Sequence, residues 1–181
     1  LDSKALRQAR KNLQMVFQDP FASLNPRMRV GDIVAEGLLV HGLGNGNERL
    51  QKVQQMLERV GLHADDVKKY PHQFSGGQRQ RIGIARALVL EPEVVVCDEP
   101  VSALDVSVQA QILLLLKTLQ KEMNLSYIFI THDLRVVRHI ADEMVVMNKG
   151  KIVEQGDVNT IYQSPQQSYT RDLLKAIPGQ K

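Results

Sequence analysis

Phe74-Ser75-Gly76-Gly77-Gln78 opens a segment that predicts the start of a helix facing a phosphate group. A serine can cap the helix, and two glycines in its first turn leave backbone N–H groups with nothing bulky in front of them. Such a helix end attracts anions. An ordinary capped turn is the alternative for an isolated Ser-Gly-Gly, but the complete run through Arg81 favours phosphate binding.

Two adjacent carboxylates follow the next apolar run, at residues 93–97. Asp98 and Glu99 stand where a buried strand meets solvent, a costly place for two like charges unless a cation or substrate compensates. One carboxylate can hold Mg²⁺ through its water shell, while its neighbour orients or deprotonates an attacking water. The alternative is a pair of exposed acids in a loop, which is not rare after an apolar run.

Helices that alternate with short apolar strands after Ser75 predict an α/β fold with a parallel sheet. The expected helices cover residues 30–40, 77–90, 106–123 and 168–177, and a further helix capped by Asn47 and stopped by Gly61. Helical turns are also expected from Val158. The expected strands cover residues 12–17, 93–97, 126–130, 144–147 and 151–154, the last two forming a hairpin. We expect a core of residues 1–19 and 91–181, with a helical subdomain of residues 20–90 inserted into it.

Composition and charge indicate which classes of protein this chain can belong to. A chain of 181 residues with 43% hydrophobic and 24% charged residues is typical of one globular domain and not of disorder. Its longest apolar runs, such as residues 112–116, are far shorter than the roughly 20 residues of a membrane-spanning helix, so a membrane role requires a partner. The net charge of +3 is dispersed, which does not indicate nucleic-acid binding. The single cysteine, Cys97, is expected to be a buried, inert thiol.

Three further residues are weak signals when each is taken alone. Asp105 precedes a long helix and has an ordinary explanation as its N-cap. His132 follows a predicted strand, where a histidine is more often a surface or capping residue than a catalytic one. Gln18 ends the first predicted strand. Their order along the chain, together with the two motifs above, changes the interpretation.

That order resembles the ABC-type ATPases over essentially the whole chain. The matching segments are V-F-Q-D-P at Gln18, F-S-G-G-Q at Ser75, V-V-V-C-D-E-P at Asp98, S-A-L-D at Asp105 and I-T-H-D-L at His132. The resemblance implies a P-loop NTPase core that uses ATP and Mg²⁺.

The resemblance also implies a role for each residue. Gln18 would contact Mg²⁺ or the water and sense a membrane subunit, and Asp98 would be the metal-binding carboxylate. Glu99 would be the catalytic base, and His132 would contact the γ-phosphate. The signature motif would consist of Ser75, Gly76, Gly77 and Gln78, and Asp105 would lie across a dimer interface.

Two segments narrow the resemblance to the importers of oligopeptides, dipeptides and nickel. Residues 17–26 and the ending from Gln163 to Leu174 look like that subfamily, although Gln167-Ser168 replaces its usual His-Pro. The expected partners are therefore a second ATPase subunit, identical or different and paired head to tail, membrane permease subunits and, indirectly, an extracytoplasmic solute-binding protein. The expected location is the cytoplasmic face of the cell membrane. No nucleic-acid partner is expected.

One expected element does not occur in the 181 residues: the phosphate-binding loop G-x-x-x-x-G-K-[ST], or Walker A. In the family this loop lies upstream of a segment like residues 1–18, so we expect an N-terminally truncated chain that is inactive in isolation. Without the strand and helix of that loop, apolar edges would also stay uncovered, and we expect the isolated chain to be marginally stable or prone to aggregation.

Two other functions remain open at this point. A non-catalytic module would only donate its signature motif to a partner's ATP, or dock on a partner through residues 19–26. The second alternative is a soluble ABC ATPase that acts on nucleic acid or ribosomes. The transporter-like ending and the dispersed charge argue against it.

Overall fold

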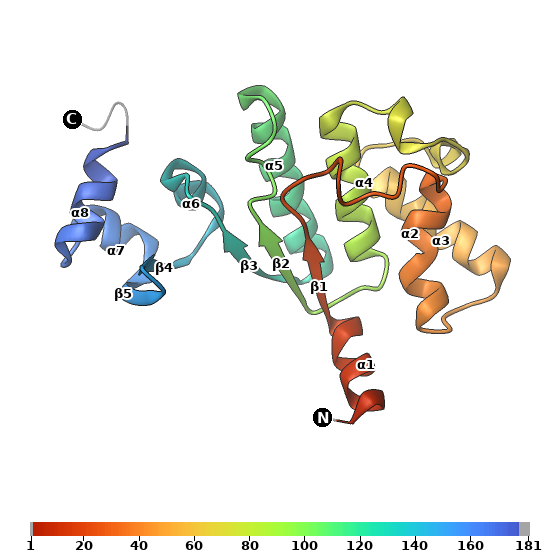
Figure 1. Ribbon diagram of the computed structural model, residues 1–181, viewed down its shortest axis with the longest axis horizontal. Helices are drawn as coiled ribbons and strands as arrows, with labels where there is room; N and C mark the ends of the chain where they lie inside the picture. The colour runs from red at the N-terminus through yellow and green to blue at the C-terminus, as the bar shows by residue number, and fades with distance from the viewer. Residues whose placement is uncertain (1, 178–181) are drawn as a thin grey trace. The chain divides into compact units, whose positions relative to one another are not determined.

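The computed structural model describes residues 2–177 and separates into two compact units, Leu1–Ile130 and Thr131–Lys181 (Figure 1). The first unit holds a three-stranded parallel sheet in the order β1-β2-β3, formed by β1 (Leu13–Val16), β2 (Val94–Asp98) and β3 (Ser126–Ile130). Val16 pairs with Cys97, and Asp98 pairs with Ile130. The predicted parallel α/β sheet is confirmed, and it brings the carboxyl ends of β1 and β2 together.

Three side chains on one face of this sheet are fully buried. Val16, Val95 and Cys97 are at most 1% exposed, and they lie on the side of α4 (Gly76–Leu88), which packs against β1. Tyr127 of β3 donates a hydrogen bond of 3.0 Å to the carbonyl of Leu116 in α5 (Val106–Met123). Burial raises the pKa of Cys97 to about 12, so its thiol stays protonated, as expected for an inert buried cysteine.

The opposite face of the sheet carries apolar side chains that remain about half exposed. Leu13, Ile128 and Ile130 are 51%, 54% and 48% exposed, and the strand register places them on one face. Parallel sheets are normally covered on both faces.

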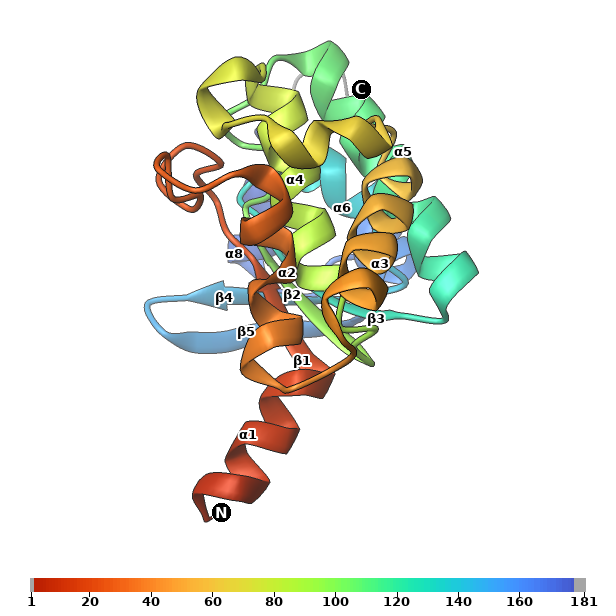
Figure 2. The ribbon, with the colours of Figure 1, turned by 90° about the vertical axis from the view of Figure 1, so that its right-hand side faces the viewer.

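Helices α2 (Val30–Val40) and α3 (Gly46–Arg59) pack against each other and against α4 (Figure 2). The predicted cap of α3 was wrong by two residues. Asn45, not Asn47, accepts the N–H groups of Asn47 and Glu48, while the Glu48 carboxylate accepts the Asn45 N–H at 2.8 Å. This reciprocal capping box fixes the start of the helix. Gly61 ends it with a φ of +77°, as predicted.

Two short 3₁₀ turns, Ala64–Lys68 and Pro71–Gln73, link α3 to α4. Asp66 in the first turn is 3% exposed, accepts the His63 N–H at 3.0 Å and pairs with the Lys69 ammonium at 2.7 Å. Burial alone would raise the pKa of Asp66, but Lys69 and the His63 N–H outweigh it and lower the pKa. The ionised carboxylate therefore stabilises this turn.

We expect Asp66→Asn to lower the free energy of unfolding by about 1–2 kcal/mol at pH 7, because it removes a charge-assisted pair whose lysine is half exposed and partly screened. Since the folded pKa is depressed, the contribution is present above about pH 4 and is lost as the pH falls through the folded pKa. Urea unfolding at pH 7 and pH 3 checks both parts. Asp65→Asn, an exposed neighbour with the same charge change, should stay within about 0.5 kcal/mol.

The second unit is built on an antiparallel hairpin of β4 (Glu143–Asn148) and β5 (Lys151–Asp157). Lys149 and Gly150 form its turn with φ of +49° and +76°, the backbone that a two-residue hairpin turn requires. Three helices complete the unit: α6 (Leu134–Ile140), α7 (Val158–Gln163) and α8 (Ser168–Lys175). Its core consists of Met144, Val146, Val158 and Ile161.

Two helices were not predicted. Helix α1 (Ser3–Asn12) has few apolar residues and begins at Asp2, whose carboxylate accepts the Ala5 N–H at 2.7 Å. Helix α6 has seven residues and is capped by Asp133, too short for a clear helical period. Over the described residues 2–177, every helix is too short or too polar to span a bilayer.

Candidate functional site

Gln18 and Glu99 meet at the carboxyl end of the β1–β2 pair. The Gln18 Nε2 donates to the Glu99 Oε2 at 2.9 Å, although 81 residues separate them in sequence. Parallel pairing of β1 with β2 is what brings the two strand ends together. Both residues were predicted separately as site residues, and the structure places them in direct contact.

The backbone of Glu99 is held in an uncommon conformation. Its φ is +43°, in the left-handed region, which costs a non-glycine residue roughly 1 kcal/mol or more. The Glu99 N–H donates to the Ile130 carbonyl at 2.9 Å, and the Glu99 carbonyl accepts the Ser102 hydroxyl at 3.1 Å. These bonds hold the strained turn in place, and strain of this kind is frequent at active sites.

Asp98, the last residue of β2, is partly buried and stands one residue before Glu99. The structure therefore presents two carboxylates and one amide at this end of the sheet. Within residues 2–177, no group of three or more His, Cys, Asp or Glu side chains is arranged to hold a metal ion.

The signature segment starts α4 as predicted, with the helix beginning at Gly76 rather than Gly77. Ser75 and Gln78 form a capping box: the Ser75 Oγ accepts the Gln78 N–H at 3.3 Å, and the Gln78 side chain accepts the Ser75 N–H at 3.0 Å. Ser75 itself is exposed. The helix start thus exposes Ser75, and the two glycines that follow are partly exposed.

Space around the two glycines differs sharply. A Cβ on Gly76 would lie 3.6 Å from Leu104, an ordinary contact, whereas a Cβ on Gly77 would lie 2.5 Å from the Cγ1 of Val108 in α5. Val108 is β-branched and cannot easily turn away. Gly77 therefore lets the start of α4 approach α5 closely.

We expect Gly77→Ala to lower the free energy of unfolding by about 1 kcal/mol, since overpacking costs about 1–3 kcal/mol and the gain in helix propensity returns only about 0.5–1 kcal/mol. Gly76→Ala is the matched control and should be neutral or slightly stabilising. Urea titrations compare the two, and Val108→Ala should relieve the cost of Gly77→Ala. Equal effects of the two glycine variants would contradict this packing argument.

The loop after Gln18 is clamped onto α4 by two arginines that sequence reasoning missed. The Arg79 guanidinium lies 4.2 Å from the centre of the Phe21 ring. Arg86 donates to the Ser23 carbonyl and lies 5.6 Å from the Phe17 ring. Burial lowers the pKa of Arg86. The sequence shows only that Arg86 stands between two alanines in a predicted helix, which does not indicate that it is buried.

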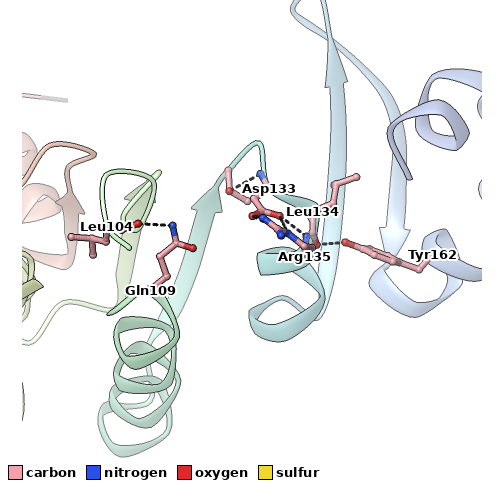
Figure 3. Close-up of polar contacts among 7 residues, drawn as sticks. Leu104, Gln109, Asp133, Leu134, Arg135 and Tyr162 are labelled. Carbon is pink, nitrogen blue, oxygen red and sulfur yellow. Dashed lines mark hydrogen bonds and ion pairs between the residues drawn. The ribbon is translucent and has the colours of Figure 1, made fainter. Parts of the chain in front are cut away.

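Asp105 is the N-cap of α5, the structural role that its position before a long helix predicted. Its carboxylate accepts the Ser107 hydroxyl at 2.7 Å and the Val108 N–H at 3.0 Å, and the Ser107 bond is the main cause of its lowered pKa. Just before it, the Leu104 carbonyl accepts the Gln109 side-chain amide at 2.9 Å (Figure 3). Hydrogen bonds to the Leu104 carbonyl and to the Asp105 carboxylate therefore fix the end of this loop.

His132 belongs to the second unit and is exposed. It follows Thr131, whose hydroxyl accepts the Asp133 N–H at 3.0 Å. Asp133 in turn caps α6 and pairs with Arg135 at 2.7 Å (Figure 3). The turn that carries His132 is thus well defined within its own unit, and its predicted role at the γ-phosphate stays a prediction.

Comparisons with known proteins agree with these motifs. Residues 1–102 match the family model described as ABC transporter. The oligopeptide transport ATP-binding protein OppF of Bacillus subtilis (strain 168) is 54% identical over 176 residues, which cover 97% of this chain and 58% of that protein. The dipeptide transport ATP-binding protein DppF of Haemophilus influenzae is 56% identical, over 98% of this chain and 54% of its own length.

A solved structure shows the same architecture. The cbiO1 protein from Clostridium perfringens, described as part of the ABC transporter complex cbiONQ, matches with a TM-score of 0.79 and 29% identity, over 98% of this chain and 68% of its own. The chain thus spans 54–58% of the length of the two curated relatives named above. The family model matches more than half of the 181 residues, and the chain therefore belongs to the ABC transporter family.

Proposed function

We propose that this chain is the ATP-binding and ATP-hydrolysing subunit, or part of it, of an importer for peptides or related small solutes. The observation that carries the proposal is the 2.9 Å hydrogen bond between Gln18 and Glu99 at the carboxyl ends of two adjacent parallel strands. Ligands of open α/β sheets bind at such strand ends. The names of the curated relatives, which are peptide-transport ATP-binding proteins, support the solute class.

Glu99 is proposed as the base that accepts a proton from the attacking water. Its carboxylate is oriented by the Gln18 amide, and its backbone is held by Ile130 and Ser102. A base fixed in this way does not have to be reoriented when the reaction occurs. Gln18 therefore acts as a positioning residue for Glu99 as well as a contact to the metal or water.

Mg²⁺ would be held by Asp98 and Gln18. Carboxylate and amide oxygens are the ligands that Mg²⁺ prefers, and the ion commonly keeps several waters and uses only one or two protein carboxylates. Asp98 ends β2 and Gln18 follows β1, so pairing of the two strands places one carboxylate and one amide at the same strand end. When bound, the ion would neutralise charge on the phosphate oxygens of ATP.

The signature segment of this chain would serve ATP held by a second ATPase subunit. Ser75, Gly76, Gly77 and Gln78 would present backbone N–H groups and a hydroxyl to its phosphates, and Asp105 would lie at the dimer interface. His132 would contact the γ-phosphate from the second unit. We also propose the division into a core of residues 1–19 and 91–181 and a helical subdomain of residues 20–90.

Permease subunits would dock near the loop of residues 19–26. Phe21 in this loop is 56% exposed and is held against Arg79 at the first turns of α4. A subunit that moves Phe21 would therefore also move the signature helix. This contact would couple the ATPase at the cytoplasmic membrane face to the permease, and an extracytoplasmic binding protein would deliver the solute.

A chimera tests the proposal. In it, residues 1–181 replace the matched segment of Bacillus subtilis OppF, so that the remainder of that relative supplies the upstream phosphate-binding loop. The chimera should restore uptake of a labelled oligopeptide in cells that lack OppF. Normal chimera levels without uptake, in the presence of the other transporter subunits, would contradict the proposal.

A non-catalytic module is the second candidate, because the 181 residues contain no G-x-x-x-x-G-K-[ST] motif. In such a module Glu99 would not act as a base in ATP hydrolysis. Uptake that survives Glu99→Gln in the chimera would favour it.

A further inference from the structure

A basic groove lies on the second unit and is lined by none of the proposed site residues. It has a volume of about 560 Å³ and is formed by α6, α7, α8 and the segment between α7 and α8. Its main lining residues are Arg138, Tyr162, Gln163, Arg171, Leu174 and Lys175, and no acidic residue lines it. Three cations thus share one small concave surface.

These three cations form no salt bridge with any described residue of the unit. Arg138 lies 5.8 Å from the centre of the Tyr162 ring. Arg171 contributes to the lowered pKa of Glu154, but the Thr170 hydroxyl and the N–H groups of Gln166 and Gln167 contribute more. Arg171 thus interacts electrostatically with Glu154 without forming a salt bridge with it.

Three carboxylates of the unit have hydrogen-bond or salt-bridge partners of their own, and Asp172, beside Arg171 on α8, does not line the groove. Asp133 pairs with Arg135 at 2.7 Å, and Glu154 accepts the Gln166 N–H at 2.7 Å. Asp157 caps α7 by accepting the Thr160 N–H at 2.9 Å. The lining of the groove thus carries three positive side chains and no negative one, which favours an anion as its ligand.

The wall of the groove is rigid and apolar. Tyr162 packs against the hydrophobic core of the unit, and its hydroxyl donates to the Leu134 carbonyl (Figure 3). Leu174 is 5% exposed. The aromatic ring is therefore held in place beside Arg138.

We propose that this groove binds a small phosphate-bearing molecule. Arg138, Arg171 and Lys175 surround its phosphate oxygens, since guanidinium groups match phosphate geometry and lysine adds a point charge. Tyr162 and Leu174 contact its apolar or flat part. A volume of about 560 Å³ lies in the range of small-molecule sites.

The experiment titrates the 181-residue chain and the chimera, each shown by circular dichroism to be folded, by calorimetry at low salt and without Mg²⁺, with inorganic pyrophosphate and with ADP. The double variant Arg171→Gln/Lys175→Gln should weaken pyrophosphate binding at least about tenfold. The control Lys149→Gln/Lys151→Gln removes the same charge from the hairpin of the same unit and should change affinity less than about twofold.

The two probes separate the sources of phosphate. Tyr162→Leu should weaken ADP and leave pyrophosphate unchanged if the occupant is a nucleotide, and should leave both unchanged if it is a free phosphate compound. Absence of pyrophosphate binding, or equal losses in the groove and hairpin double variants, would overturn the proposal. Because the readout is the difference between two variants in one unit, it does not depend on whether the chain hydrolyses ATP.

Discussion

Replacing Glu99 by glutamine in the chimera should lower the rate of ATP hydrolysis by about 10²–10⁴-fold, the usual contribution of a general base. Glutamine keeps the size of the side chain but cannot accept the proton. The hydrogen bond from Gln18 can persist, because the glutamine side chain still offers an oxygen. ATP binding should therefore survive while turnover is lost.

The measurement is steady-state phosphate release together with equilibrium binding of ATP. Glu93→Gln is the matched control, since Glu93 lies just before the start of the same strand and pairs with the Asn12 side chain. It should leave the rate within about twofold. A Glu99→Gln chimera that hydrolyses ATP at the parent rate would remove Glu99 from the mechanism.

Replacing Ser75 by arginine should lower hydrolysis at the ATP site of the second ATPase subunit by about 10²-fold, comparable to the loss of one electrostatic contact to a transition state. The long side chain would stand in front of the exposed helix start and would remove the hydroxyl. The test uses a verified mixed dimer of the chimera with a second subunit, in which the chimera also carries Glu99→Gln.

Asn47→Arg controls for the added charge, because it places an arginine in the first turn of α3, far from the signature segment in sequence. It should leave the rate unchanged. Since loss of the Ser75 cap also costs about 0.5–2 kcal/mol, circular dichroism must show that both variants are folded. An unchanged rate of ATP hydrolysis with Ser75→Arg in a folded mixed dimer would contradict the proposal that α4 contributes to the partner's ATP site.

Long, strongly patterned elements could be predicted from the sequence. The helices at residues 30–40 and 106–123 and the strand at 126–130 have the predicted bounds. The cap of α3 could also have been predicted, because Asn45 is followed three residues later by Glu48. Helix α1 could not, since it contains too few apolar residues to show a period.

The sequence predicted the individual residues of the candidate site but not the contacts between them. Parallel pairing of β1 with β2 creates the Gln18–Glu99 contact, and pairing is a tertiary property that no local pattern encodes. The left-handed backbone of Glu99 was not predicted, because glutamate has no preference for positive φ. The contact of Arg86 with Ser23 depends on the path of a loop 63 residues away in sequence.

The most direct test of the central claim is the rate of ATP hydrolysis by the purified chimera, measured beside Bacillus subtilis OppF under the same conditions. If residues 1–181 carry the hydrolytic residues, the chimera should turn over ATP within about tenfold of OppF. A folded chimera that binds ATP but releases phosphate no faster than the buffer would contradict the claim.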